Sequence, residues 1–386
     1  MKVFKLIFKN MLRHKLRTFL TIVGMSIAVI AFTILRTVVT AWSAGVEASA
    51  PDRLIVRQSV SFIFSLPFAY QDKILAVPGV EDISYATWFG GNYINKDNFF
   101  ARIALNPDKF ENIYPEYMLT KTELEDFKRE RNACVVGEDL AKQYGFKVGD
   151  LITLEGDIFP GQWEFVVRGV YKPKFKHSDA TQMFFDWEYI NERMIQTAPI
   201  RANRVGWYVV KIKEPNKSAQ ISAAIDGLFK NSSSETKTET EAAFTQGFVS
   251  ALGAIITAIN VMSFVIIGII MLVLANTMVM SARERTREYA VMKTLGFSAF
   301  HLIGLILGEA LLISALGGLL GLSLSLPLIT GLESVVPKGF FPVFFIEPIT
   351  IVLSITAVML IGVLSSIFPI RKAVQMKIVD GFRFVG

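Results

Sequence analysis

One uncharged stretch constrains the fold of this chain more than any other feature of its 386 residues. Between Glu241 and Arg283 no Asp, Glu, Lys or Arg occurs, and Ile, Val, Leu, Met and Ala dominate. A helix over these residues would be roughly 60 Å long, about twice the hydrocarbon thickness of a bilayer. We therefore predict one continuous helix, whose more polar part, 242–260, extends outside the membrane and whose part 261–280 crosses it.

Three further apolar runs are long enough to cross a bilayer. They cover residues 18–35, 300–328 and 348–370, and only the second contains an acid, Glu309. A charged side chain inside a membrane is costly, so we expect Glu309 to have a partner. A cleaved signal peptide is the competing interpretation of 18–35, but the run is long for one and follows an amphipathic segment.

Basic residues gather at the ends of these runs. Lys and Arg exceed the acids in segments 1–17, 282–298 and 371–386. Because basic residues mark the cytoplasmic side of membrane proteins, both termini and the segment 282–298, called the connector below, are predicted to be cytoplasmic. The net charge of +6 thus follows membrane topology and gives no support to nucleic-acid binding.

The residues from about 45 to 240 are predicted to form a soluble domain of mixed strands and helices. Short apolar or alternating runs indicate strands, and Ser218–Lys230 reads as a helix. The predicted strands cover 53–57, 163–171 and 205–213. Residues 135–145 are predicted to form a strand end and a short helix, and 147–154 a turn followed by another strand. Residues 231–241 are rich in Ser, Thr and Glu and are predicted to be a polar linker.

Aromatic side chains cluster twice in this domain, at Phe62, Phe64 and Phe68 and then at Trp88, Phe89, Tyr93, Phe99 and Phe100. They are explained either by core packing and interface anchoring or by a path for an apolar or lipidated substrate. The sequence leaves both explanations open.

The connector is predicted to contain a short amphipathic helix. Tyr289, Met292 and Leu295 recur every three residues, and Gly296 can stop the helix in a left-handed conformation. Glu284 and Arg287 are spaced to form a pair along its surface. Such a helix is placed to receive a push from a soluble partner; the alternative is a loop that only fixes topology.

Three stretches of the chain resemble MacB-type, FtsX-like ABC transporter permeases, a family that includes lipoprotein-releasing and macrolide-exporting systems. Residues 284–298 resemble the family's signature loop, 309–321 resemble its third span, and 369–383 resemble the cytoplasmic end of its fourth. The wording of 137–141 and 148–153 is similar to the family's extracytoplasmic domain.

The resemblance implies a membrane α-helical bundle of four transmembrane helices with an α+β extracytoplasmic domain inserted between the first and second. In chain order we expect a cytoplasmic amphipathic helix (1–17), transmembrane helix 1 (18–44), the extracytoplasmic, periplasmic-type domain (45–241), a stalk with transmembrane helix 2 (242–281), a cytoplasmic coupling helix (282–298), transmembrane helix 3 (299–330), an extracytoplasmic loop (331–347), transmembrane helix 4 (348–370) and a cytoplasmic tail (371–386).

The resemblance also implies the site residues. The ATPase-coupling residues would be Arg283, Glu284, Arg285, Arg287, Glu288, Tyr289, Met292, Lys293, Leu295 and Gly296. The intramembrane residues would be Glu309, in a structural or coupling role, and Gly317, Gly318 and Gly321, which offer a small face for close helix packing.

The implied function is that of a non-catalytic permease subunit in the inner membrane. It would transmit ATPase motion to the extracytoplasmic domain, to expel or extract a lipoprotein, lipid, peptide or drug-like substrate. The expected partners are a separate cytoplasmic ABC ATPase that binds ATP and Mg, a second permease copy or paralogue, a periplasmic adaptor and membrane lipid, without nucleic acid. The alternatives are an FtsX-like regulator of a cell-wall hydrolase and a transporter driven by an ion gradient.

Motifs that would indicate chemistry in the chain itself do not occur. The sequence contains no Gly-x-x-x-x-Gly-Lys-Ser/Thr loop, no His-Glu-x-x-His and no Gly-x-Ser-x-Gly. Its single cysteine, Cys134, cannot form an intrachain disulfide. We therefore expect no catalytic, cofactor or metal site in this chain and place ATP hydrolysis on the partner.

Overall fold

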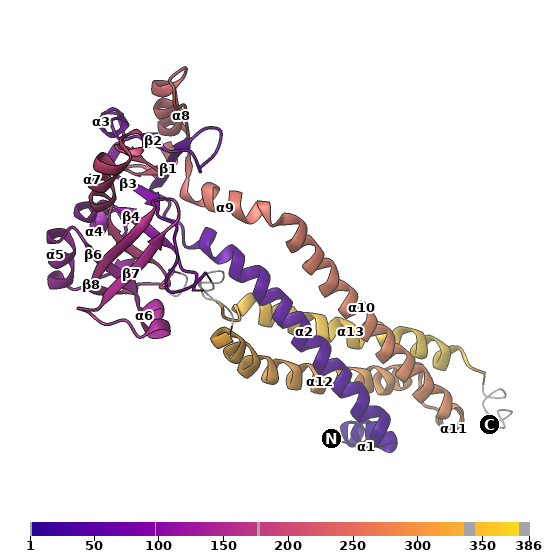
Figure 1. The fold of residues 1–386 in the computed structure, drawn as a ribbon. Helices are drawn as coiled ribbons and strands as arrows, with labels where there is room; N and C mark the ends of the chain where they lie inside the picture. Colours follow the sequence, from indigo (N-terminus) through magenta and orange to yellow (C-terminus); the bar gives the residue numbers. More distant parts are fainter. Residues whose placement is uncertain (1, 97, 176–177, 336–343, 378–386) are drawn as a thin grey trace. The chain divides into compact units, whose positions relative to one another are not determined.

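The computed structural model describes residues 2–96, 98–175, 178–335 and 344–377 (Figure 1). The chain divides into two compact units. Among the described residues, the helical unit comprises 2–40, 253–335 and 344–377, and the α+β unit comprises 41–96, 98–175 and 178–252. Residues 336–343 of the predicted outer loop and residues 378–386 at the end of the predicted tail lie outside the described residues.

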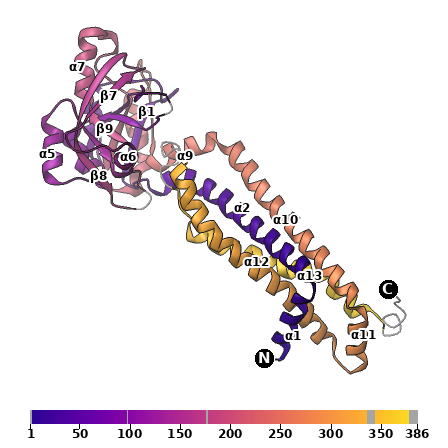
Figure 2. The ribbon, with the colours of Figure 1, turned by 60° about the horizontal axis from the view of Figure 1, so that its bottom comes forward.

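Long apolar helices build the helical unit. Its elements are α1 (Lys2–Met11), η1 (Leu12–His14), α2 (Lys15–Glu47, of which the end belongs to the α+β unit), α10 (Gly253–Glu284), α11 (Thr286–Thr294), α12 (Ala299–Val335) and α13 (Pro348–Gln375). Figures 1 and 2 show α2, α10, α12 and α13 running alongside one another, and α13 packs against both α12 and α10. These four are long and apolar enough to cross a membrane by length and composition.

Glycines let α12 approach its neighbours closely. A Cβ on Gly317 would lie 2.5 Å from Met25 of α2, and one on Gly321 would lie 2.7 Å from Val29 of the same helix. A Cβ on Gly318 would lie 2.7 Å from Val358 of α13. Because real Cβ atoms do not come so near, side chains here would force the three helices apart.

The predicted continuous helix from 242 to 282 is wrong, because the structure interrupts it. Helix α9 (Glu241–Ala251) belongs to the α+β unit and ends at Leu252, whose N–H bonds to the carbonyls of Val249 and Ser250. Helix α10 starts at Gly253, in the helical unit. Glycine is a poor helix former and marks a natural break, so the two units meet along the chain at a non-helical residue.

One sheet organises the α+β unit. Ten strands of the described chain form it in the order β12-β1-β11-β3-β4-β9-β6-β8-β5, with β7 on β8, while β2 and β10 form a separate pair. The strands are β1 (Arg53–Gln58), β2 (Leu66–Pro67), β3 (Val80–Trp88), β4 (Arg102–Leu105), β5 (Tyr117–Met118), β6 (Ala133–Gly137), β7 (Leu151–Gly156), β8 (Gly161–Pro173), β9 (Met183–Asp186), β10 (Arg204–Val205), β11 (Trp207–Ile212) and β12 (Thr236–Thr240).

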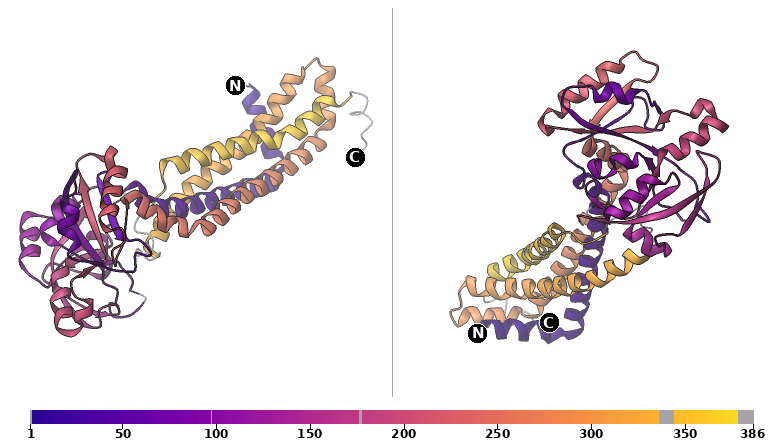
Figure 3. Two further views of the ribbon diagram at one scale, coloured as in Figure 1. Left: turned by 90° about the horizontal axis from the view of Figure 1, so that it is seen from above. Right: turned by 90° about the vertical axis from the view of Figure 1, so that its left-hand side faces the viewer.

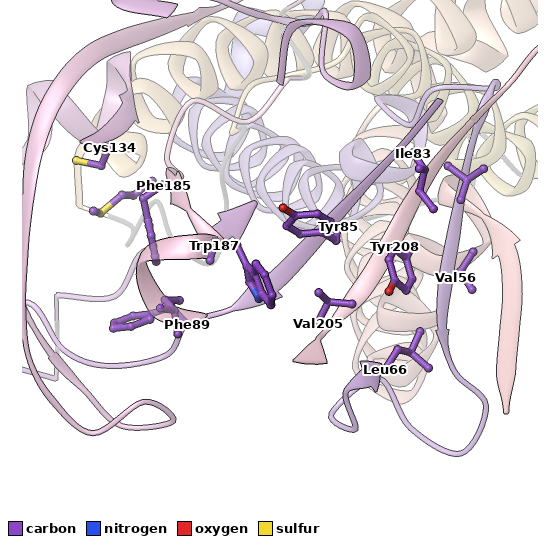
Figure 4. Close-up of a cluster of buried hydrophobic side chains, with 14 of the residues drawn as sticks. Val56, Leu66, Ile83, Tyr85, Phe89, Cys134, Phe185, Trp187, Val205 and Tyr208 are labelled. Carbon is purple, nitrogen blue, oxygen red and sulfur yellow. The ribbon is translucent and has the colours of Figure 1, made fainter. Parts of the chain in front are cut away.

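The sheet is buried on both faces. In β6, Cys134 and Val136 enter one core while Ala133 and Val135 enter another, as the two-residue period of a strand requires. Figure 4 shows part of the first core, including Cys134, and Figure 3 shows the helices around the sheet. The remaining helices of this unit are α3 (Tyr70–Leu75), η2 (Pro107–Lys109), α4 (Phe110–Ile113), α5 (Lys121–Arg129), α6 (Glu138–Tyr144), α7 (Trp187–Thr197), η3 (Pro199–Arg201), η4 (Pro215–Lys217) and α8 (Ser218–Phe229).

The predicted polar linker over 231–241 is wrong in its second half, because strand β12 lies there. It pairs antiparallel with β1, with Thr238 opposite Val56. Alternation of threonines with Lys237 and Glu239 is a strand period, and Asp226 of α8 holds the hydroxyls of Thr236 and Thr238 at 2.8 and 2.7 Å. A polar composition concealed an edge strand.

Candidate functional site

The connector between α10 and α12 makes two sharp changes of direction. The first lies at Arg285, which separates α10 from α11. The second follows α11, where Gly296 has a φ of 87° and the N–H of Phe297 bonds back to the carbonyl of Met292 at 3.0 Å. This pattern is a Schellman motif with glycine in the left-handed position, and it ends the helix where the sequence predicts.

Glu309 of α12 finds its partner in the connector. The guanidinium of Arg285 donates from Nη1 to Glu309 Oε2 at 2.8 Å, and Ser281 donates to Oε1 at 3.3 Å. The two charged side chains are only 5% and 6% exposed. An ion pair this deeply buried fixes the start of α11 to α12, because separating the partners would leave a bare charge in an apolar surrounding.

The other acids of the connector bind residues 12–17, which are η1 and the start of α2 and are called the N-terminal segment. Glu284 accepts two bonds from Arg17, each of 3.0 Å, and lies 3.1 Å from His14 Nε2. Glu288 pairs with Arg13. The predicted pair between Glu284 and Arg287 is therefore wrong: Glu284 turns toward the N-terminal segment instead.

Glu288 also lies beside Arg285, with Nε and Oε2 3.2 Å apart. Partial burial acts to raise the pKa of Glu288, but hydrogen bonds from Arg13 and Arg285 and the charges of these two residues outweigh it. The pKa therefore falls below the usual range. Glu288 is held in its charged form between the N-terminal segment and the connector.

Lys293 fastens the far end of α11. Its ammonium donates to the carbonyls of Val374 and Met376 at 2.8 and 2.7 Å, where α13 ends. A cation at a helix C-terminus satisfies carbonyls that have no partner within the helix and matches the helix dipole. The connector is thus bound to α12, to α13 and to the N-terminal segment by separate polar contacts.

The apolar residues of the connector divide into a buried and an exposed set. Tyr289 is buried, which raises its pKa to about 12, and Met292 packs on the same core. Leu295, which recurs in the same three-residue spacing, is instead 71% exposed. Phe297 and Phe300, which are 45% and 83% exposed, join it and were missed by the sequence reasoning.

The sequence held a signal for Phe297, because a large apolar side chain outside the apolar runs directly follows Gly296, the glycine that stops the helix. Phe300 is the first residue of the apolar run 300–328 and carried no separate signal. Arg283 and Arg287 are exposed and, within the described ranges, have no ion pair. Arg283 borders a hollow of about 580 Å³ together with Tyr289 and Lys372. Among the residues that the structure describes, no three His, Cys, Asp or Glu side chains are grouped to hold a metal.

Two family profiles match the chain. The one described as FtsX-like permease C-terminal matches residues 260–378, and the one described as MacB-like periplasmic core domain matches residues 18–228, more than half of the sequence. The first therefore includes the connector and α12, and the second includes most of the α+β unit.

Known proteins align with this chain over different fractions of its length and of their own. An uncharacterised ABC transporter permease of Methanocaldococcus jannaschii is 24% identical, with 97% of this chain and 96% of the relative aligned. The macrolide export ATP-binding/permease protein MacB of Bordetella avium is 28% identical over 58% of this chain and 34% of its own length. The periplasmic region of MacB from Actinobacillus actinomycetemcomitans aligns with 53% of this chain and 95% of its own at 12% identity, with a TM-score of 0.38.

Proposed function

This chain belongs to the family of FtsX-like, MacB-type ABC transporter permeases, and from that premise we propose that a separate ABC ATPase drives it by pushing on the connector. It is a membrane protein with four apolar helices and an extracytoplasmic domain, the α+β unit. In the proposal the connector and both termini lie in the cytoplasm, the membrane is the inner membrane, and ATP with Mg is bound and hydrolysed on the partner.

The observation that carries the proposal is the contrast between the two sides of the connector. Glu284, Arg285, Glu288 and Lys293 of the connector are bound within the chain. The apolar side chains of Leu295 and Phe297, and of Phe300 at the start of α12, are exposed. Exposed apolar side chains that gather at one tip, next to basic residues, are typical of a protein-binding surface. The ATPase would bury this tip.

Polar contacts would pass the push onward. Arg285 is bound to Glu309 of α12, Lys293 to the end of α13, and Glu284 to Arg17 of α2. A displacement of α11 would therefore act on three helices together instead of bending one loop. It would reach the α+β unit through the continuous helix α2 and through Leu252, where the chain passes between the units.

The pairing of Glu309 helps to decide whether ATP hydrolysis or an ion gradient supplies the energy for transport. An acid that carries protons across a membrane must be able to lose its counterion or gain a proton. Glu309 is instead bound to a buried arginine of the same chain. This favours an ATP-driven permease over a transporter driven by an ion gradient. Regulation of a cell-wall hydrolase would use the same mechanics on a different client.

Affinity purification of the tagged chain from its native cells tests the proposal. We expect an ABC ATPase to copurify and the complex to hydrolyse ATP. Leu295→Asp and Phe300→Asp place a charge in the buried interface, so ATPase recovery should fall about tenfold or more. Leu228→Asp in α8, where Leu228 is 51% exposed, is the matched control and should retain the ATPase.

Membrane insertion is checked for each variant, so that lost recovery is not confused with lost protein. Wild-type ATPase recovery and hydrolysis in both connector variants would contradict the proposal. Equal loss in Leu228→Asp would also count against it, since that residue is distant in the chain and belongs to the other unit.

A further inference from the structure

A groove with a cavity volume of about 1010 Å³ opens on the surface of the α+β unit. Six aromatic residues line it, namely Phe62, Trp88, Phe159, Trp207, Phe244 and Phe248. They come from the loop after β1, the end of β3, the β7–β8 turn, the start of β11 and helix α9. Pockets for small molecules typically measure about 300–1,000 Å³, so this groove accepts a large ligand.

The apolar wall of the groove is assembled and yet uncovered. Phe62 meets Phe248 edge to face with ring centroids 5.1 Å apart, and Phe244 meets Phe248 at 5.0 Å. Phe62 and Phe248 nevertheless remain 40% and 45% exposed. Large contiguous patches of exposed apolar surface typically mark binding sites for proteins, membranes or ligands.

Two arginines supply the polar part of the groove. Arg204 donates from Nε to Ser65 Oγ and from Nη2 to the Ser65 carbonyl, both at 2.6 Å. Arg201 donates from Nη1 to the carbonyl of Ile158 at 3.0 Å. All three acceptor atoms are neutral, and within the described part of the chain neither guanidinium forms an ion pair.

One acid, Asp157, also lines the groove, and its carboxylate accepts from Asn92 at 3.3 Å. The lining therefore holds two cations against one anion. An anionic group brought to Arg201 and Arg204 would complete their charge balance, and guanidinium groups bind phosphates and carboxylates better than other partners.

We propose that this groove binds an amphiphile that has an acyl chain and an anionic head group. The acyl chain lies along the aromatic wall, where its removal from water supplies most of the affinity. The head group lies against Arg201 and Arg204, which selects anionic over neutral amphiphiles. Binding itself does not depend on the proposed function; that the amphiphile is the transported substrate does rest on it.

Tryptophan quenching tests the binding, because Trp88 and Trp207 lie in the groove wall. The full chain is placed in nanodiscs of neutral phosphatidylcholine without any ATPase and titrated with dibromostearate. We expect saturable quenching by dibromostearate. The uncharged methyl ester should bind at least about tenfold more weakly. The variant Trp88→Phe/Trp207→Phe reports the quenching that arises outside the groove and should lose the saturable part.

Charge variants test the head-group site. Arg201→Gln/Arg204→Gln should weaken dibromostearate binding about tenfold and leave the methyl ester unchanged. Lys213→Gln/Lys230→Gln removes two exposed positive charges from the same unit and should change nothing. If the double arginine variant fails to fold, Arg201→Gln alone keeps the bonds of Arg204 to Ser65 and gives the same test.

Apolar variants test the wall. Phe62→Ser/Phe248→Ser should weaken both probes, whereas Leu228→Ser, an equally exposed apolar change elsewhere on the unit, should not. Equal affinity for the acid and its ester, or unchanged affinity in the arginine variants, would overturn the proposal. Conversion of a dimer into monomers by Phe62→Ser/Phe248→Ser would identify a second copy as the occupant and overturn it as well.

The two proposals fail separately. Dibromostearate binding without a copurifying ATPase would leave the groove assignment intact and remove the ATP-driven function. A copurifying ATPase without saturable quenching would remove the groove assignment and leave the permease proposal intact.

Discussion

Each unit of this protein contains a nearly inaccessible arginine that contacts two acids, and the two clusters differ in how far the second acid is buried. In the helical unit, Arg285 is the cation that holds the buried carboxylate of Glu309. In the α+β unit, Arg53 is 4% exposed and contacts both Glu116, at 2.7 Å, and Glu241, at 2.9 Å. Arg285 also contacts Glu288 at 3.2 Å, but Glu288 is 38% exposed, so the first cluster depends on one buried acid. In the second cluster both acids are largely buried, since Glu116 and Glu241 are 13% and 20% exposed.

The second cluster also joins the two ends of the α+β unit's chain, near residues 50 and 241. Glu241 accepts from the backbone N–H of Ala50 at 2.8 Å, so it ties the start of α9 to the chain just before β1. Burial opposes the charge on Arg53, but Glu241 and Glu116 outweigh it and raise the pKa of Arg53 above its usual value. We therefore expect the Arg53 cluster, whose two acids are at most 20% exposed, to tolerate the loss of one partner better than the Arg285–Glu309 pair does.

The largest effect is expected from Arg285→Ala, because Glu309 would remain buried without a cation. Breaking one side of a buried pair costs about 3–5 kcal/mol. Loss of helical circular dichroism during titration with sodium dodecyl sulfate measures the stability of the full chain. Arg285→Ala/Glu309→Gln removes the orphaned charge and should recover most of the loss. A double variant no more stable than Arg285→Ala would contradict the assignment.

A smaller effect is expected from Glu241→Gln. Arg53 keeps Glu116, and the amide can still accept a hydrogen bond, so the cost should be about 1–3 kcal/mol. The buried thiol of Cys134 reports unfolding of this unit, since it reacts with a dye only once exposed. Urea-dependent labelling of the full chain therefore gives the stability. Glu214→Gln, whose pair with Lys217 is exposed, is the control, and equal midpoints for both variants would refute the role of the Arg53 cluster.

The smallest effect is expected from Glu284→Gln, which removes the pair with Arg17. Glu284 is 42% exposed, and exposed pairs contribute about 1 kcal/mol or less. High salt should bring the wild type and the variant together, because ions screen such pairs. A loss as large as that of Arg285→Ala, measured by the same detergent titration, would show that the two contacts do not differ as proposed.

Local patterns determined much of the architecture. Uncharged runs predicted the apolar helices, a short apolar run between two arginines predicted β1, and Gly296 predicted the end of α11. A lone acid in an apolar run predicted that Glu309 needs a partner. Each of these is a property of a short segment, so no knowledge of the rest of the chain was required.

Only the tertiary structure decided which residues meet. Glu284 pairs with Arg17 and not with its neighbour Arg287, and Arg53 meets Glu241 across most of the α+β unit's length in sequence. Tertiary contacts likewise sent Phe89 into the core and left Phe62 in the groove. The period of a segment specifies its faces, but the partner of each face depends on contacts between residues far apart in the chain.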